Sequence, residues 1–192
     1  MAPSIEILPP NPAALSHSDK DIAANANTNF NSNANTAPPP THPDRIQVNR
    51  SAEAFSNSAT SLISLPAGAL FAKMTSATPA PKRTYTSVAT GEQTQIELNS
   101  DLVFCNHSCA PSLVFDMARM EVRVAEDRPL RKGDALTFFY PSSEWTMVQP
   151  FACTCGEDGC LGVIAGASDL SRDVLEKYWL NEHVVQLMEQ RK

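Results

Sequence analysis

The chain has 192 residues, of which 42% are hydrophobic and 19% charged, enough apolar side chains for one modest core. Its 15 lysine and arginine residues against 21 aspartate and glutamate residues give a formal net charge of −6. An acidic chain without a basic cluster repels phosphate backbones, so we expect no direct nucleic-acid partner. Because it shows neither a membrane-spanning apolar stretch nor a secretion signal, we expect an intracellular protein, cytoplasmic or nuclear, that does not enter a membrane.

The first 45 residues differ in composition from the rest of the chain. They contain many proline and asparagine residues, one aromatic residue (Phe30) and no cysteine. Such a segment buries too little apolar surface to offset the entropy lost on folding. The composition predicts a disordered tail over residues 1–45, with a docking arm that folds on binding as the alternative.

From residue 46 onward the chain alternates apolar and polar residues in short runs. The expected strands begin around Ile46 and Val48 and end at Pro141, and they lie at 62–65, 69–73, 85–88, 96–98, 113–115, 120–124 and 136–140. Helical spacing occurs only near the end, after Ser171 as N-cap, with a break near Asn181 and Glu182. The pattern predicts a mostly β fold with a C-terminal helix.

All five cysteines lie in the second half of the chain, and Cys153, Cys155 and Cys160 form a Cys-x-Cys-x4-Cys loop. In an intracellular protein such spacing favours zinc over disulfides. Three ligands come from the loop, and the fourth is Cys109 or Cys105. Buried thiols in a packed strand and an open catalytic zinc site are the alternatives.

Three segments resemble motifs of the SET domain family, in the family's order. Asn106-His107-Ser108-Cys109-Ala110-Pro111 resembles its Asn-His-Ser-Cys-x-Pro motif. The run from Gly133 to Tyr140 is similar to its Gly-Glu-Glu-Leu-Thr-x-x-Tyr strand, and Phe151 to Cys160 is similar to its post-SET zinc loop. The tail of the chain is similar to that of small fungal SET-domain proteins.

The resemblance implies a knotted β fold that binds S-adenosylmethionine on one side and a lysine on the other. It implies that Asn106 and His107 contact the cofactor, that Tyr140 is the catalytic tyrosine, and that Cys109 completes a structural zinc site with Cys153, Cys155 and Cys160. The chain then divides into a tail (1–45), a minimal SET-like domain (46–150), a post-SET loop (151–165) and a C-terminal helix (166–192).

The segment 51–58 departs from the family pattern. Family members begin with a Gly-x-Gly turn that approaches the cofactor, whereas 51–58 contains no glycine. Three functions therefore remain: a methyltransferase that uses S-adenosylmethionine to methylate a protein lysine or an amine, a SET scaffold reused for small-molecule chemistry in fungal specialised metabolism without methyl transfer, and an inactive SET-like interaction module. The sequence predicts no oligomeric state.

Overall fold

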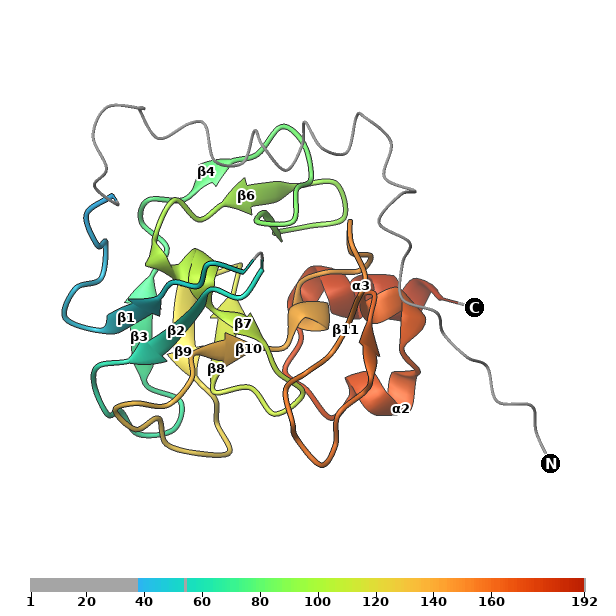
Figure 1. The fold of residues 1–192 in the computed structure, drawn as a ribbon. Coiled ribbons are helices and arrows are strands. Elements are labelled where there is room, and N and C mark those ends of the chain that lie inside the picture. Colours follow the sequence, from blue (N-terminus) through green and yellow to red (C-terminus); the bar gives the residue numbers. More distant parts are fainter. Residues whose placement is uncertain (1–37, 54, 192) are drawn as a thin grey trace. The chain divides into compact units, whose positions relative to one another are not determined.

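The computed structural model of the chain describes residues 38–53 and 55–191. Most of the predicted tail, residues 1–37, therefore lies outside the described residues. A five-stranded sheet forms the centre of the described part (Figure 1). Its strand order is β3 (Leu70–Lys73), β9 (Glu121–Val124), β8 (Leu113–Asp116), β10 (Thr137–Phe138) and β7 (Asn106–His107).

Three small sheets surround the central one. They are β1 (Ile46–Asn49) with β2 (Ser58–Ser61), β4 (Thr78–Pro79) and β5 (Val88–Ala89) on either side of β6 (Gln95–Glu97), and β11 (Phe151–Ala152) with β12 (Val163–Ile164). Single-turn 3₁₀ helices occur at η1 (Asp101–Phe104), η2 (Tyr140–Ser142) and η3 (Ala167–Asp169). The mostly β fold expected from the alternating pattern is confirmed.

Alternation along β8 and β9 explains why the sheet has a buried face. Val122 and Val124 of β9 are buried, and Phe115 of β8 stacks on Phe138 of β10 with ring centroids 4.0 Å apart. Side chains two residues apart point to the same side of a strand, so each strand places its apolar set in one core. These strands hold the segments that carry the candidate site residues.

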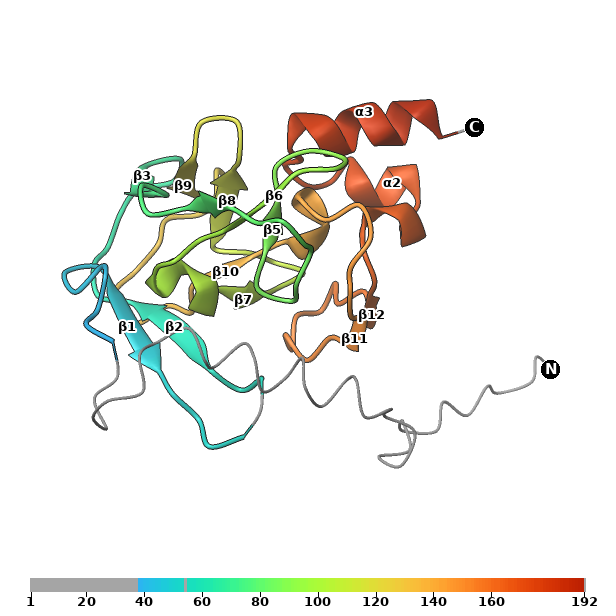
Figure 2. The same cartoon turned by 90° about the horizontal axis from the view of Figure 1, so that it is seen from above.

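The C-terminal region forms two helices where a single one was expected. They are α2 (Arg172–Leu175) and α3 (Glu182–Gln190), preceded by Ser171 and Asn181, whose side chains make no capping hydrogen bond. The chain leaves the helical path between them, at the predicted break. Leu175, Val184 and Met188 pack with Phe139 and Ala167 into a second apolar cluster, and Figure 2 shows α3 beside the loop that joins β5 to β6. Within the described residues, no helix has the length and apolar character needed to cross a membrane.

The chain before β1 is attached to the domain at Asp101. The Asp101 carboxylate accepts hydrogen bonds from the backbone N–H groups of Thr41 (2.6 Å) and His42 (3.1 Å). In return, the backbone N–H of Asp101 donates to the Thr41 hydroxyl over 2.7 Å. Residues 41–45, assigned to the tail from composition, are therefore anchored in this structure, because composition does not reveal hydrogen bonds to a residue 60 positions away.

Parallel pairing of β10 with β7 brings the two predicted motifs together. Thr137 lies opposite Asn106, and Phe138 lies opposite His107. The backbone N–H of Ser108 also donates to the carbonyl of Phe138 over 3.2 Å. The Asn-His-Ser-Cys segment and the approach to Tyr140 are thus neighbours in space.

Candidate functional site

Four cysteines form a compact cluster, and they are the four that the sequence analysis assigned to zinc. The sulfur atoms of Cys109, Cys153, Cys155 and Cys160 all lie within 4.8 Å of one another. Cys105 is not among them. It is buried in the main core directly after η1, and burial raises the pKa of its thiol to about 12. It lies at the point where the chain passes from η1 into β7.

The loop that carries three of these cysteines is closed at its base by a short strand pair. Phe151 pairs with Ile164 and Ala152 with Val163, and the backbone N–H of Cys153 donates to the carbonyl of Gly162 over 2.7 Å. Gly156 has a φ of 73°, a left-handed conformation that glycine adopts without strain. The loop therefore curls back and points its thiols inward.

The thiol cluster fits a tetrahedral metal ion. Zinc bound at about 2.3 Å by four thiolates holds its sulfur ligands somewhat less than 4 Å apart. The Cys109 and Cys153 sulfur atoms are 4.0 Å apart. The backbone N–H of Leu161 donates to the Cys109 sulfur over 3.3 Å, and such a donor favours the thiolate.

The thiols of the cluster differ in acidity. Burial raises the pKa of Cys109, and it raises the pKa of Cys153 to about 12. For Cys155 burial acts in the same direction, but backbone hydrogen bonds at Cys109 and Glu157, together with the side chains of Cys153 and Cys160, outweigh it and lower the pKa to about 6. These hydrogen bonds favour the thiolate form of Cys155, and a bound cation would favour deprotonation of all four thiols.

His107 links the thiol cluster to Tyr140. Its Nδ1 accepts a hydrogen bond from the backbone N–H of Tyr140 over 3.2 Å, and its Nε2 lies 3.4 Å from the Cys109 sulfur. Burial lowers the pKa of His107 to about 4, so the ring is neutral at physiological pH. Because Nδ1 is the acceptor, Nε2 carries the proton and donates it toward the sulfur. The sequence motif named His107 as a cofactor contact and gave no sign of this bridging position.

Tyr140 begins η2, with one residue between it and the end of β10, and does not lie in the expected strand. Pro141 follows it in the first turn of η2, where a missing N–H is tolerated and the fixed φ suits a helical turn. The Tyr140 hydroxyl donates to the Cys105 carbonyl over 3.3 Å, and the ring packs among His107, Phe138 and Phe151. Burial raises the pKa of Tyr140, so its hydroxyl remains a donor and does not act as a base.

Asn106 contacts the loop at 51–58, which lacks the glycines of the family's cofactor-binding turn. Its side-chain N–H donates to the carbonyl of Asn57 over 2.9 Å. In that loop Phe55 has a φ of 60°, the left-handed conformation that a glycine would adopt without strain. Its ring is 70% exposed and packs edge-on against Tyr85 at 5.6 Å. The loop therefore makes a left-handed turn without glycine.

The hydrogen-bond donor and acceptor at this position match the two charged groups at the methionine end of S-adenosylmethionine. An amide N–H suits a carboxylate, and a backbone carbonyl suits an ammonium group. Asn106 and Asn57 supply one of each and satisfy one another in this structure.

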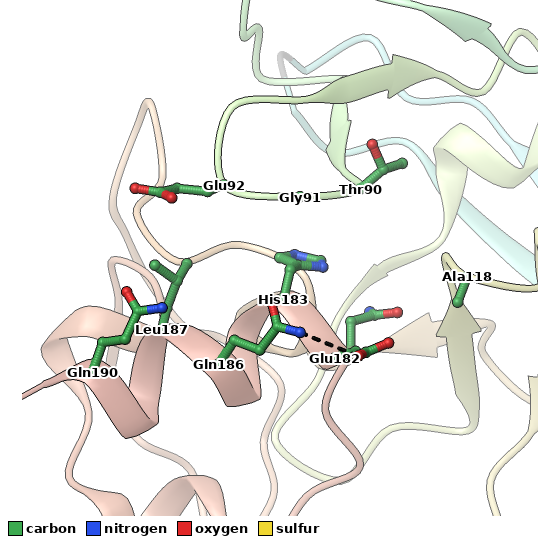
Figure 3. Close-up of a pocket in the computed structure, with 10 residues that line it drawn as sticks. Thr90, Gly91, Glu92, Ala118, Glu182, His183, Gln186, Leu187 and Gln190 are labelled. Atoms are coloured by element: carbon green, nitrogen blue, oxygen red, sulfur yellow. Dashed lines mark hydrogen bonds between the residues drawn. The ribbon is translucent and has the colours of Figure 1, made fainter.

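Two adjoining cavities lie elsewhere on the described surface. One, of about 350 Å³, lies between α3 and the loop at Thr90–Glu92, and Figure 3 shows His183 and Gln186 on the helix facing that loop. The other, of about 570 Å³, is lined by Arg83 and Trp145 and shares Glu92 and Leu187 with the first. Neither cavity is lined by Asn106, His107 or Tyr140.

Comparison with known proteins gives one extensive similarity and several shorter ones. No family model matches the chain. The chain is 62% identical over 149 residues to the methyltransferase flvH of Aspergillus flavus, an alignment that covers 78% of this chain and 84% of that protein. It is 33% identical over 73 residues to the H3 lysine-36-specific histone-lysine N-methyltransferase of Chaetomium globosum, and 32% to that of Aspergillus fumigatus. These shorter matches cover 36% of this chain and 8% of each enzyme.

The fold, the site and these similarities define the class as a methyltransferase. The weaker matches also support the SET-like resemblance of the motifs. More particularly, the chain belongs to the family of the methyltransferase flvH.

Proposed function

We propose that this protein is an S-adenosylmethionine-dependent N-methyltransferase that methylates the amine of a lysine or of a small molecule, and that zinc holds its site together. The observation that carries the proposal is the position of His107. One ring nitrogen accepts from the backbone of Tyr140, and the other faces the sulfur of Cys109. The cofactor motif, the candidate catalytic tyrosine and the metal cluster are therefore one connected unit.

The cofactor supplies a methyl group activated by a positively charged sulfur. Asn106 and the backbone of the loop at Asn57 would bind its amino-acid end, with the donor and acceptor described above. Tyr140 would orient the reacting groups through a hydroxyl that stays protonated. Methyl transfer depends on in-line geometry, which rigid neighbours supply without acid or base catalysis.

The amine must reach Tyr140 without its proton, because this site offers no obvious base. His107 is neutral, but its Nδ1 lone pair is already used by the Tyr140 backbone. Neutral aromatic rings around Tyr140 favour an uncharged amine over an ammonium ion that has lost its water. We therefore expect the rate to rise with pH as the substrate amine loses its proton.

The four-cysteine cluster supports a structural role for the metal. All four positions are taken by protein thiols, whereas a catalytic zinc keeps one position open. Zinc would tie the loop of Cys153–Cys160 to Cys109, and through Cys109 to His107. The arrangement supports the expected post-SET zinc loop, in which the metal would have a mechanical function.

The test is calorimetric titration of the purified protein with S-adenosylmethionine, followed by transfer of a labelled methyl group to free lysine, simple alkylamines and a lysine-containing peptide. We expect binding and N-methylation of at least one amine. Asn106→Ala should weaken cofactor binding, while Gln190→Ala on the exposed face of α3 should not. Binding without transfer to any amine would favour an interaction module, and absence of binding would favour a scaffold without methyl transfer.

A further inference from the structure

The segment Tyr178–His183, here called the C-terminal clamp, contacts the chain on both sides of Tyr140. Before Tyr140, the ring of Phe139 stacks on Tyr178 with centroids 3.7 Å apart and planes 6° from parallel. After Tyr140, the carbonyl of Ser142 accepts from the backbone and side-chain N–H groups of Asn181, at 2.9 and 3.0 Å. The clamp thus holds the residue before Tyr140 and the turn after it.

Asn181 makes the most connections in the clamp. Its side chain is almost fully buried, at 3% exposure, and both its donor and acceptor ends are used. The amide N–H groups donate to the carbonyls of Ser142 and Phe115, each at 3.0 Å, and the amide oxygen accepts from the backbone of Met117 at 2.9 Å. One side chain therefore joins the end of β8 to η2.

Two other residues of the clamp contact backbone carbonyls, one at the thiol cluster and one directly after Ser142. The Tyr178 hydroxyl donates to the carbonyl of Cys109 over 3.0 Å. His183 Nε2 lies 2.8 Å from the carbonyl of Ser143. The clamp therefore contacts the backbone at one candidate metal ligand as well as the turn that carries Tyr140.

The turn that carries Tyr140 has little structure of its own to hold it. η2 is a single 3₁₀ turn of three residues, and such short turns have poor hydrogen-bond geometry and low intrinsic stability. Without the Asn181 side chain, the Phe115 carbonyl and the Met117 N–H would each lose a partner, and the Ser142 carbonyl would keep only the backbone N–H of residue 181. Buried backbone groups without partners are costly, so the local structure would shift to satisfy them.

We propose that Asn181 is a positioning residue that fixes the Tyr140 ring through η2, and that the C-terminal clamp is a functional part of the methyl-transfer site. The inference rests on the proposed role of Tyr140. It assigns a function to a region beyond the cysteine loop, where the sequence showed only an interrupted helix.

The first experiment compares kcat and KM of Asn181→Ala with those of Leu130→Val, at a temperature where both variants are folded. Leu130 is buried in the bridge to Leu65, so its variant controls for a general loss of packing. We expect Asn181→Ala to lower kcat about tenfold to hundredfold with little change in KM, because the reacting geometry is lost. A kcat equal to that of Leu130→Val would overturn the proposal.

A double-mutant cycle tests whether Asn181 acts through Tyr140. In a Tyr140→Phe background, Asn181→Ala should lower kcat far less than in the wild type, since the positioned hydroxyl is already gone. An equal loss in both backgrounds would contradict the inference. Tyr178→Phe, which keeps the ring and loses only the bond to Cys109, is the milder variant if Asn181→Ala folds poorly.

Hydrogen–deuterium exchange gives a readout that does not need activity. Asn181→Ala should speed exchange in residues 139–147 and 115–119 beyond the change seen with Leu130→Val. If the wild type transfers no methyl group, the proposed function fails while this measurement still decides whether the clamp holds the turn. Unchanged exchange in both segments would show that Asn181 does not hold it.

Discussion

The backbone N–H of Tyr140 donates to Nδ1 of His107 across 3.2 Å, although 33 positions separate the two residues in the chain. This bond fixes the proton on Nε2 and directs it at the Cys109 sulfur. The tautomer of the His107 ring therefore depends on the backbone position of the candidate catalytic residue. A change at the thiol cluster should in turn alter the position of Tyr140, through His107.

Metal content is the first test of the site. Protein purified without chelator should contain about one zinc per chain, and removing it should lower the melting temperature by several degrees, because the loop then loses its anchor. Cys109→Ser should lose the metal. Cys105→Ala should keep it, because Cys105 lies outside the cluster. A metal-free wild type with freely titratable thiols would contradict the assignment.

Replacement of Tyr140 by phenylalanine separates chemistry from folding. The variant keeps the ring contacts with His107 and Phe138 and loses one hydrogen bond to Cys105, which costs about 1 kcal/mol of stability. We expect zinc and cofactor binding to persist and the rate of methyl transfer to fall by about a hundredfold. Single-turnover kinetics beside a thermal melt would measure both. Full activity would show that the hydroxyl has no part in catalysis.

Glu144 should make stability depend on pH. Its carboxylate accepts from the backbone N–H of Ala89 over 2.8 Å, and burial raises its pKa above the ordinary 4.5 despite that bond. Between the unfolded and folded pKa values the folded state binds more protons, so stability falls as pH rises through this window. Glutamine keeps the acceptor oxygen and cannot ionise.

The free energy of unfolding of Glu144→Gln, relative to wild type, should therefore increase as pH rises from about 4 toward neutrality. Denaturant titrations at several pH values measure it. Glu189→Gln, on the exposed face of α3, is the matched control and should leave the wild-type pH dependence unchanged. A Glu144→Gln curve parallel to that of the wild type would contradict the assignment.

The hydrogen bonds between Thr41, His42 and Asp101 set the shortest stable chain. A chain beginning at Pro38 keeps these bonds and should have the same melting temperature as the full-length protein. A chain beginning at Asp44 leaves the buried Asp101 carboxylate without these donors and should lose about 2 kcal/mol. Asp101→Ala should lower the free energy of unfolding much less in the shorter chain than in the longer one. Equal melting temperatures for the two chains would show that the anchor contributes nothing.

Alternation of apolar and polar residues predicted the strands whose own residues show that pattern. Val122 and Val124 alternate with charged residues, and β9 was correctly expected there. The strand β2 was missed because its residues, Ser58 to Ser61, include only one apolar side chain and depend on pairing with β1. A strand held mainly by its partner leaves little trace in its own sequence.

The candidate site also contains some features that the local sequence predicts and others that it does not. The spacing of Cys153, Cys155 and Cys160 predicted three members of the cluster, because ligands close in sequence have few ways to arrange themselves. The fourth member, Cys109, followed only from the resemblance to the SET motif, since spacing left Cys105 as an alternative. The position of Tyr140 in a 3₁₀ turn was missed, since aromatic residues after an apolar run also favour a strand. The contacts of Asn181 join residues 39 to 66 positions away, and no local pattern reveals such bonds.

The pairing of β7 with β10 limits which insertions and deletions the chain can tolerate. Each strand has only two residues, so a slip of one position would exchange the faces of Asn106 and His107. A residue gained or lost between His107 and Leu113, or between Phe138 and Tyr140, should therefore abolish function even where the protein still folds. The exposed turn at 126–129 lies outside this pairing, and length changes in natural or engineered variants should concentrate there.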